Sequence, residues 1–271
     1  MTDRLWSGAT SQAWATASNW ITGLPGAGDH LRLSPLYSVA IDGSDQSATA
    51  IGDFIVEDGY ASTIGDKTTN LKIDPNFFLY NGSGQAFFDL HSAAITAEIQ
   101  KTASVGSGQH GLYLICSALT ELSVIDGDVG VAANHNTSAT VTTANINGGT
   151  VTFGEGTTLT TLNIYGGTAV IRCGVTTVNM FGGYATLEEQ AAVTTLNISG
   201  SGAMAYNSTG TIGTCNIAGG GFIDCTQVGL GRTISTLKIN DGSIRYDPDR
   251  VTVSARSEPD DPVSESVGKA Y

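Results

Sequence analysis

The chain has 271 residues and carries 25 acidic but only 12 basic side chains, which gives a formal net charge of −13. It contains no run of Lys and Arg, so a protein that tracks nucleic-acid phosphates is excluded. Charged residues make up 14 % of the chain, roughly half of the share that is usual in soluble domains. With 35 glycines, this composition favours short strands and tight turns over salt-bridged helices.

Residues 1–50 come first and hold all three tryptophans, Trp6, Trp14 and Trp20. We expect this segment to be an N-terminal cap or attachment segment, because large aromatic side chains can seal the apolar end of a repeat domain. Its opening residues, MTDRLWSGAT, lack the apolar core of a secretory signal. No stretch of the chain reaches the roughly 18 apolar residues that span a bilayer. We therefore expect synthesis in the cytoplasm and no membrane partner.

Residues 51–253 repeat a short strand that ends in a glycine turn. The clearest copies are Ala144-Asn145-Ile146, Leu162-Asn163-Ile164, Val178-Asn179-Met180, Leu196-Asn197-Ile198, Cys215-Asn216-Ile217 and Leu237-Lys238-Ile239. Weaker copies lie at Phe54-Ile55-Val56, Leu71-Lys72-Ile73, Ala97-Glu98-Ile99 and Leu122-Ser123-Val124. A motif that recurs about ten times at irregular spacing is typical of a solenoid, which absorbs length changes in its loops.

Within each repeat the apolar residues alternate, as they do in a half-buried strand. Leu162 and Ile164 are predicted to point inward, and Gly166-Gly167 then turns the chain into a second short strand. A third segment, such as Val175-Thr176-Thr177, closes the coil. We predict an all-β fold, a right-handed parallel β-helix of about ten coils, since parallel crossovers are right-handed by default. An antiparallel sandwich is the alternative.

Two outward-facing features stand out. The middle residues of successive motifs form an asparagine column, which we expect to be a structural ladder of stacked amides: Asn145, Asn163, Asn179, Asn197 and Asn216. A sugar- or partner-binding stripe is the alternative. Beside this column we expect an exposed apolar strip of Tyr165, Phe181, Val170 and Met204. Exposed contiguous apolar surface tends to mark an interface, so these four residues are predicted to lie between copies of the chain.

Residues 254–271 form an acidic segment with two prolines and few apolar residues, which predicts a flexible tail or an arm that orders on a partner. The four cysteines, Cys116, Cys173, Cys215 and Cys225, form no Cys-x-x-Cys pair. We interpret them as buried free thiols, and we expect neither a zinc site nor a disulfide framework.

The sequence shows no catalytic constellation, so we expect a protein that is not an enzyme and needs no metal or cofactor. Glycan cleavage requires carboxylates that converge on one groove. The only acidic residues that we expect to be adjacent in an outward column are Glu57 and Asp74, which we interpret as solvated, with a catalytic pair as the alternative. The adjacent Glu188 and Glu189 are interpreted as turn residues exposed to solvent, with a calcium contact as the alternative.

The opening pattern Trp6, Trp14, Asn19-Trp20, Gly23, Pro25 and Asp29, together with the Leu-x-Ile-x-Gly-Gly coils, resembles a loose group of bacteriophage virion proteins and bacterial surface solenoids. The resemblance extends to about residue 253. It implies a homotrimeric capsid decoration or cement protein on the outer surface of the phage head, with the major capsid protein as partner. A receptor-binding fibre or tailspike that binds or cleaves a glycan, and a bacterial surface adhesin, are the alternatives.

Overall fold

The protein is nearly all-β, with parallel strands stacked as a β-solenoid of about 11 turns, close to the ten that were expected. The computed structural model describes residues 2–91, 95–133, 137–227, 231–257 and 266–267. The chain divides into two compact units, Met1–Thr142 and Thr143–Tyr271, and strand β10 (Ala139–Ile146) contains the boundary.

The described residues of the first unit form nine strands and two short 3-10 helices before β10. In chain order these are β1 (Asp3–Trp6), η1 (Ala17–Asn19), β2 (Trp20–Ile21), β3 (His30–Leu33), η2 (Pro35–Tyr37), β4 (Asp45–Val56), β5 (Leu71–Tyr80), β6 (Ala86–Leu90), β7 (Ile95–Ile99), β8 (Leu112–Val124) and β9 (Asp128–Val131). Strands β3, β4, β5, β7 and β8 pair in parallel from one turn to the next. Among the described strands, only β1 and β2 pair antiparallel.

One predicted repeat of this unit is wrong. Leu71-Lys72-Ile73 was expected to stack on Phe54-Ile55-Val56, but Phe54 pairs with Phe78 and Leu71 pairs with Phe88. The reason is that β5 is ten residues long and contributes to two columns of strands. Its second half, Phe78-Leu79-Tyr80, is the true copy, with aromatic residues in place of the usual aliphatic ones.

This register also separates Glu57 from Asp74, so their predicted proximity is wrong. Asp74 pairs with Ala50 in the middle of β4, whereas Glu57 follows the last residue of that strand. Glu57 instead accepts a hydrogen bond from Arg32 at 3.2 Å. The structure therefore brings no carboxylate pair together at this place.

The three tryptophans form one buried cluster in the first unit. Trp20 packs edge-on against both Trp6 and Trp14, with ring centroids 5.1 and 4.7 Å apart. Trp14 then stacks on Phe54 of β4, at 6.2 Å. The aromatic cluster thus contacts the first apolar residues of the solenoid, while β3, inside residues 1–50, already pairs in parallel with β4.

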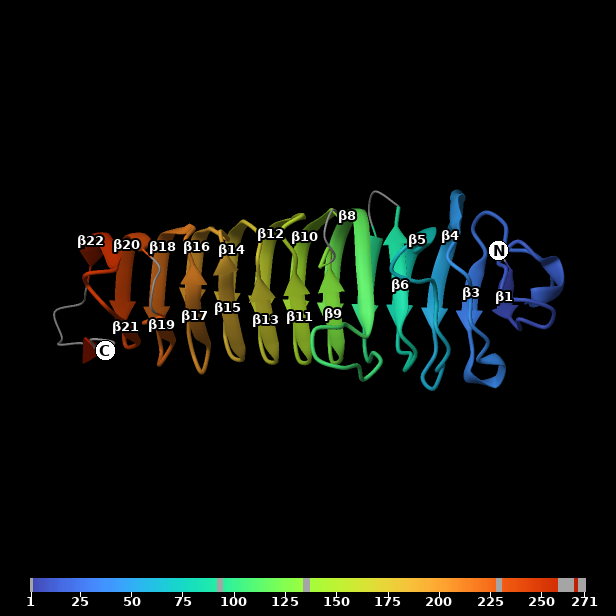
Figure 1. Cartoon of the computed structure of the whole chain (residues 1–271), viewed down its shortest axis with the longest axis horizontal. Coiled ribbons are helices and arrows are strands. Elements are labelled where there is room, and N and C mark those ends of the chain that lie inside the picture. The colour runs from blue at the N-terminus through green and yellow to red at the C-terminus, as the bar shows by residue number, and fades with distance from the viewer. Residues whose placement is uncertain (1, 92–94, 134–136, 228–230, 258–265, 268–271) are drawn as a thin grey trace. The chain divides into compact units, whose positions relative to one another are not determined.

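The second unit contains the regular repeats (Figure 1). Its strands after β10 are β11 (Thr150–Phe153), β12 (Thr157–Ile164), β13 (Thr168–Ile171), β14 (Val175–Met180), β15 (Tyr184–Glu189), β16 (Val193–Ile198), β17 (Ala203–Ser208), β18 (Thr211–Ala218), β19 (Phe222–Cys225), β20 (Arg232–Asn240), β21 (Ser243–Tyr246), β22 (Val251–Ser257) and β23 (Ser266–Val267). Even-numbered and odd-numbered strands form two separate parallel columns. The predicted third segment is not a separate strand, because Val175-Thr176-Thr177 begins β14.

The turns that connect the two columns of strands require glycine at specific positions. Gly167 and Gly183 have φ of +71° and +69°, which side chains rarely tolerate. A Cβ atom at Gly167 would also lie 2.5 Å from the carbonyl oxygen of Gly149 in the turn below. These turns are therefore stacked too closely for any side chain.

All four cysteines are free and buried, as expected. Burial raises the pKa of Cys116, Cys173 and Cys225 to about 12. Near the C-terminus, β22 pairs in parallel with β20 up to Ser257, so the first residues of the predicted tail belong to the sheet. Most of the remaining tail, residues 258–265 and 268–271, lies outside the described residues.

Candidate interaction surface

The most regular surface of the second unit is the outer side of β12, β14, β16 and β18. We call it the Thr–Asn face, and it consists of a threonine column (Thr161, Thr177, Thr195 and Thr214), an asparagine column (Asn163, Asn179, Asn197 and Asn216) and the aromatic pair Tyr165 and Phe181. The Cα atoms of each column are in register from strand to strand. The asparagines were predicted from the sequence and the threonines were missed, although each threonine lies two residues before its asparagine.

The asparagine column is hydrogen-bonded along its whole length. Each Nδ2 donates to the Oδ1 of the asparagine one turn earlier: Asn163 to Asn145 at 2.8 Å, Asn179 to Asn163 at 2.9 Å, Asn197 to Asn179 at 2.7 Å and Asn216 to Asn197 at 2.7 Å. The stacked amides that the sequence predicted are therefore present. Because all four bonds point the same way, their dipoles add and each bond polarises the next.

The Thr–Asn face carries no charge. The four strands β12, β14, β16 and β18 contain no Asp, Glu, Lys, Arg or His. The hydroxyls of Thr161, Thr177, Thr195 and Thr214 make no side-chain hydrogen bond to another described residue. This face thus offers free hydroxyl groups and no charge to a partner, in a chain whose net charge is −13.

The aromatic pair lies at one margin of the face. The rings of Tyr165 and Phe181 stack with centroids 5.1 Å apart and planes within 11° of parallel. The two residues remain 52 % and 50 % exposed.

The other two residues of the predicted apolar strip do not continue it. Val170 points outward on β13, but Thr152 and Thr186 flank it, and it lies beyond the Gly166-Gly167 turn from Tyr165. The prediction for Met204 is wrong, because this side chain is 1 % exposed. Met204 pairs with the buried Ala185, so on β17 the inward positions begin at the second residue of the strand.

A solvent-open cavity of about 600 Å³ lies at the C-terminal ends of the odd-numbered strands of the second unit. Its lining comes from the turns that follow β11, β13, β15 and β17 and includes Glu155, Arg172, Cys173, Glu189 and Thr209. Arg172 binds Glu188 and Glu189, which are therefore not simply solvated. Glu155 lines the same cavity, and its interaction with Glu189 is the main cause that raises the pKa of Glu189.

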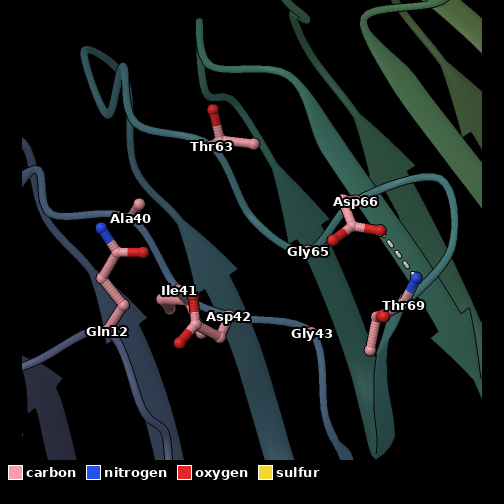
Figure 2. Close-up of a pocket in the computed structure, with 9 residues that line it drawn as sticks. All are labelled: Gln12, Ala40, Ile41, Asp42, Gly43, Thr63, Gly65, Asp66 and Thr69. Carbon is pink, nitrogen blue, oxygen red and sulfur yellow. Dashed lines mark hydrogen bonds between the residues drawn. The ribbon is translucent and has the colours of Figure 1, made fainter.

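The first unit has a polar pocket of about 270 Å³, shown in Figure 2. Asp42 lies on the side of Gln12, and Asp66 lies on the side of Thr69. The Oδ1 of Asp66 accepts hydrogen bonds from the backbone nitrogens of Thr68 and Thr69, so this carboxylate stabilises its own loop. The two acids do not converge on a common point, and the pocket provides no acid–base pair.

Among the described residues, no three His, Cys, Asp or Glu side chains gather as metal ligands would. The same part of the chain contains no helix of the length and apolarity that a membrane crossing requires. No protein-family model, no curated protein and no solved structure matches the chain. The Thr–Asn face itself is therefore the main guide to function.

Proposed function

We propose that the chain is a non-enzymatic structural protein of a larger particle, and that copies of it associate through the Thr–Asn face and its aromatic pair. The observation that carries this proposal is the absence of charge on a broad, ordered face of a strongly acidic protein. Two copies that each carry a net charge of −13 repel each other, most strongly where acidic surfaces meet. A charge-free face avoids both that repulsion and the cost of removing charges from water.

The chemistry of this face suits contact with a second copy. Interface centres are depleted of charge and enriched in Tyr and Phe, as this face is. Threonine hydroxyls can donate to and accept from the same groups of a symmetric copy. Oligomers of identical chains use closed symmetry, so each copy contributes the same patch. A homotrimer is the assembly that the resemblance to virion solenoids implies, and we adopt it as the expected stoichiometry.

The finer proposal is a capsid decoration or cement protein on the outer surface of a bacteriophage head. It is supported by the resemblance of residues 6–29 and of the glycine-ended coils to phage virion solenoids. Three rigid copies would each contact the major capsid protein, and trivalency would multiply weak contacts into firm attachment. Particles that lack the protein should then show weakened shells in electron microscopy. Unaltered shells combined with failed adsorption to the host would instead favour a receptor-binding fibre.

The self-association step is tested by measuring mass in solution by light scattering. Phe181→Glu places a charge in the aromatic pair of the proposed contact and should reduce the mass from three chains to one. Leu36→Glu is the matched control, because Leu36 is 82 % exposed and lies in the other unit. It should leave the mass unchanged. A wild-type monomer, or a trimer that tolerates Phe181→Glu, contradicts this interface.

A further inference from the structure

The sequence contains two Asn-Gly pairs, Asn81-Gly82 and Asn147-Gly148, and they lie in different surroundings. Asparagine is a thermolabile residue, because its side-chain amide can be attacked by the backbone nitrogen of the next residue. Glycine in that next position favours the attack, since it has no Cβ atom in the way and its backbone is the most adaptable. The surroundings of each pair therefore decide how readily it reacts.

Asn147 is exposed and directly follows the last residue of β10. Its side-chain amide makes no hydrogen bond to a residue that the structure describes, and neither does the backbone nitrogen of Gly148. Within the described part of the chain, the amide and the nitrogen that can attack it are therefore not tied to other groups. Water also reaches this side chain, and water is needed to complete the reaction.

The pair Asn81-Gly82 is held in place instead. Gly82 is buried, and a Cβ atom there would lie 3.0 Å from Cγ1 of Val56 and 3.1 Å from the carbonyl oxygen of Tyr60. The backbone nitrogen of Asn81 donates to the carbonyl oxygen of Val56 at 2.9 Å, and the residues that follow Gly82 donate to that of Tyr60 at 2.8 and 3.2 Å. A turn held in this way must open locally before it can react, so its rate falls with the population of the open state.

Asn147 lies directly beside the aromatic pair of the Thr–Asn face. The backbone nitrogens of Tyr165 and Gly166 both donate to the carbonyl oxygen of Ile146, the residue before Asn147, at 2.8 and 3.3 Å. A Cβ atom at Gly166 would lie 2.6 Å from the carbonyl oxygen of Asn147 itself. The backbone of Phe181 makes the same hydrogen bond one turn later. Asn147, Tyr165 and Phe181 therefore hold the same position in three successive turns.

We propose that Asn147 is a self-modification site, at which the backbone nitrogen of Gly148 converts the neutral amide into a carboxylate beside Tyr165. The nitrogen of Gly148 forms a bond to Cγ of Asn147, and the side-chain amide nitrogen leaves as ammonia, with the proton that the nitrogen of Gly148 gives up. Water then opens the resulting succinimide ring at either carbonyl carbon, which yields aspartate or isoaspartate. Both products carry one negative charge, and the conversion consumes only water.

The new carboxylate places a charge at the margin of the uncharged Thr–Asn face. A charge-changing modification in an interface weakens it through repulsion and through the cost of removing the charge from water. Copies in a symmetric assembly contribute the same group, so the new charges also repel one another. Self-association should therefore weaken as the chain ages. This consequence rests on the proposed function, whereas the modification itself does not.

The test incubates the purified chain at neutral and at mildly alkaline pH and follows both Asn-Gly pairs by peptide mass spectrometry. Asn147 should convert at least about tenfold faster than Asn81, because only Asn81 needs local opening. It should convert faster at the higher pH, because the attacking nitrogen must lose its proton. Asn147→Ser is the matched control, since Ser199 makes the same backbone hydrogen bond in the turn after Phe181, and it should remove the acidic product. Conversion of Asn147 no faster than that of Asn81 overturns the proposal.

Anion-exchange chromatography then separates converted from unconverted chains, and light scattering measures the mass of each over a range of concentrations. The converted chains and Asn147→Asp should dissociate at concentrations about tenfold higher or more. Gln109→Glu adds the same charge at an exposed position of the other unit and should have no such effect. Equal dissociation of converted and unconverted chains overturns the effect on assembly. A wild-type monomer contradicts the proposed function alone, and the two conversion rates then still decide whether Asn147 is a self-modification site.

Discussion

The Nδ2 of Asn179 donates to the Oδ1 of Asn163 at 2.9 Å, and the Cα atoms of the same two residues are partners in the register of β12 and β14. The side-chain hydrogen bond therefore forms only when the two strands are paired in this register. A slip by one residue would move every asparagine of a strand to the inner side and break the ladder. The column thus specifies register in addition to stabilising it.

Replacing Asn179 by Ala should lower the free energy of unfolding by about 1–3 kcal/mol, because it breaks two side-chain hydrogen bonds in the ladder. Thr177→Ala is the control, two residues earlier on the same side of β14, and should cost less than about 1 kcal/mol. Chemical denaturation of both variants checks this. Equal losses would mean that the ladder contributes nothing beyond strand propensity.

Replacing Met204 by Ala should destabilise the protein by about 2–5 kcal/mol, since the truncation leaves a cavity in the core. Val170→Ala, on the outer side of β13, should cost less than about 1 kcal/mol. Thermal or denaturant unfolding of the two variants measures this difference in stability. A small effect at Met204 would contradict the inward orientation that the structure gives it.

Gly167→Ala should cost at least about 1–2 kcal/mol, because alanine must adopt a positive φ. The added Cβ would also meet the carbonyl of Gly149. Gly174→Ala is the matched control, since its Cβ would meet nothing within 4 Å. It should be neutral or slightly stabilising, because it restricts the unfolded chain. Gly167→Ala should melt at a lower temperature than Gly174→Ala, and the reverse order would contradict this prediction.

The first unit should lose stability in acid partly through Asp29. Hydrogen bonds from Arg4 and from the backbone of Gly26 and Thr2 lower the pKa of Asp29 to about 2. A lowered pKa gives stability that is present above the ordinary value of 3.8 and lost as the pH falls through about 2. Unfolding followed by tryptophan fluorescence should show this loss, and Asp29→Asn should be less stable at neutral pH and less sensitive to acid. An unchanged acid profile would contradict it.

Much of the second unit could be predicted from the sequence, because its turns repeat the same alternation and most of them carry Gly-Gly after the first strand. Asn163, Asn179 and Asn197 could be placed in one column for that reason. Met204 could not be placed correctly, since the glycines before β17 do not fix which residue of the strand first points inward. In the first unit, the second copy of the motif in the long strand β5 has aromatic residues in place of aliphatic ones. It was therefore not recognised, and the predicted register of Leu71 was wrong.

The one-directional asparagine ladder has a consequence for how the chain can change in length. Asn163, Asn179 and Asn197 each donate a hydrogen bond to the turn before and accept one from the turn after. The contact between one turn and the next along this column is therefore the same at each position. Duplicating the 16 residues that separate Asn163 from Asn179 would insert a turn whose amide partners are already in place. Growth by whole repeats therefore needs no compensating substitutions along this column.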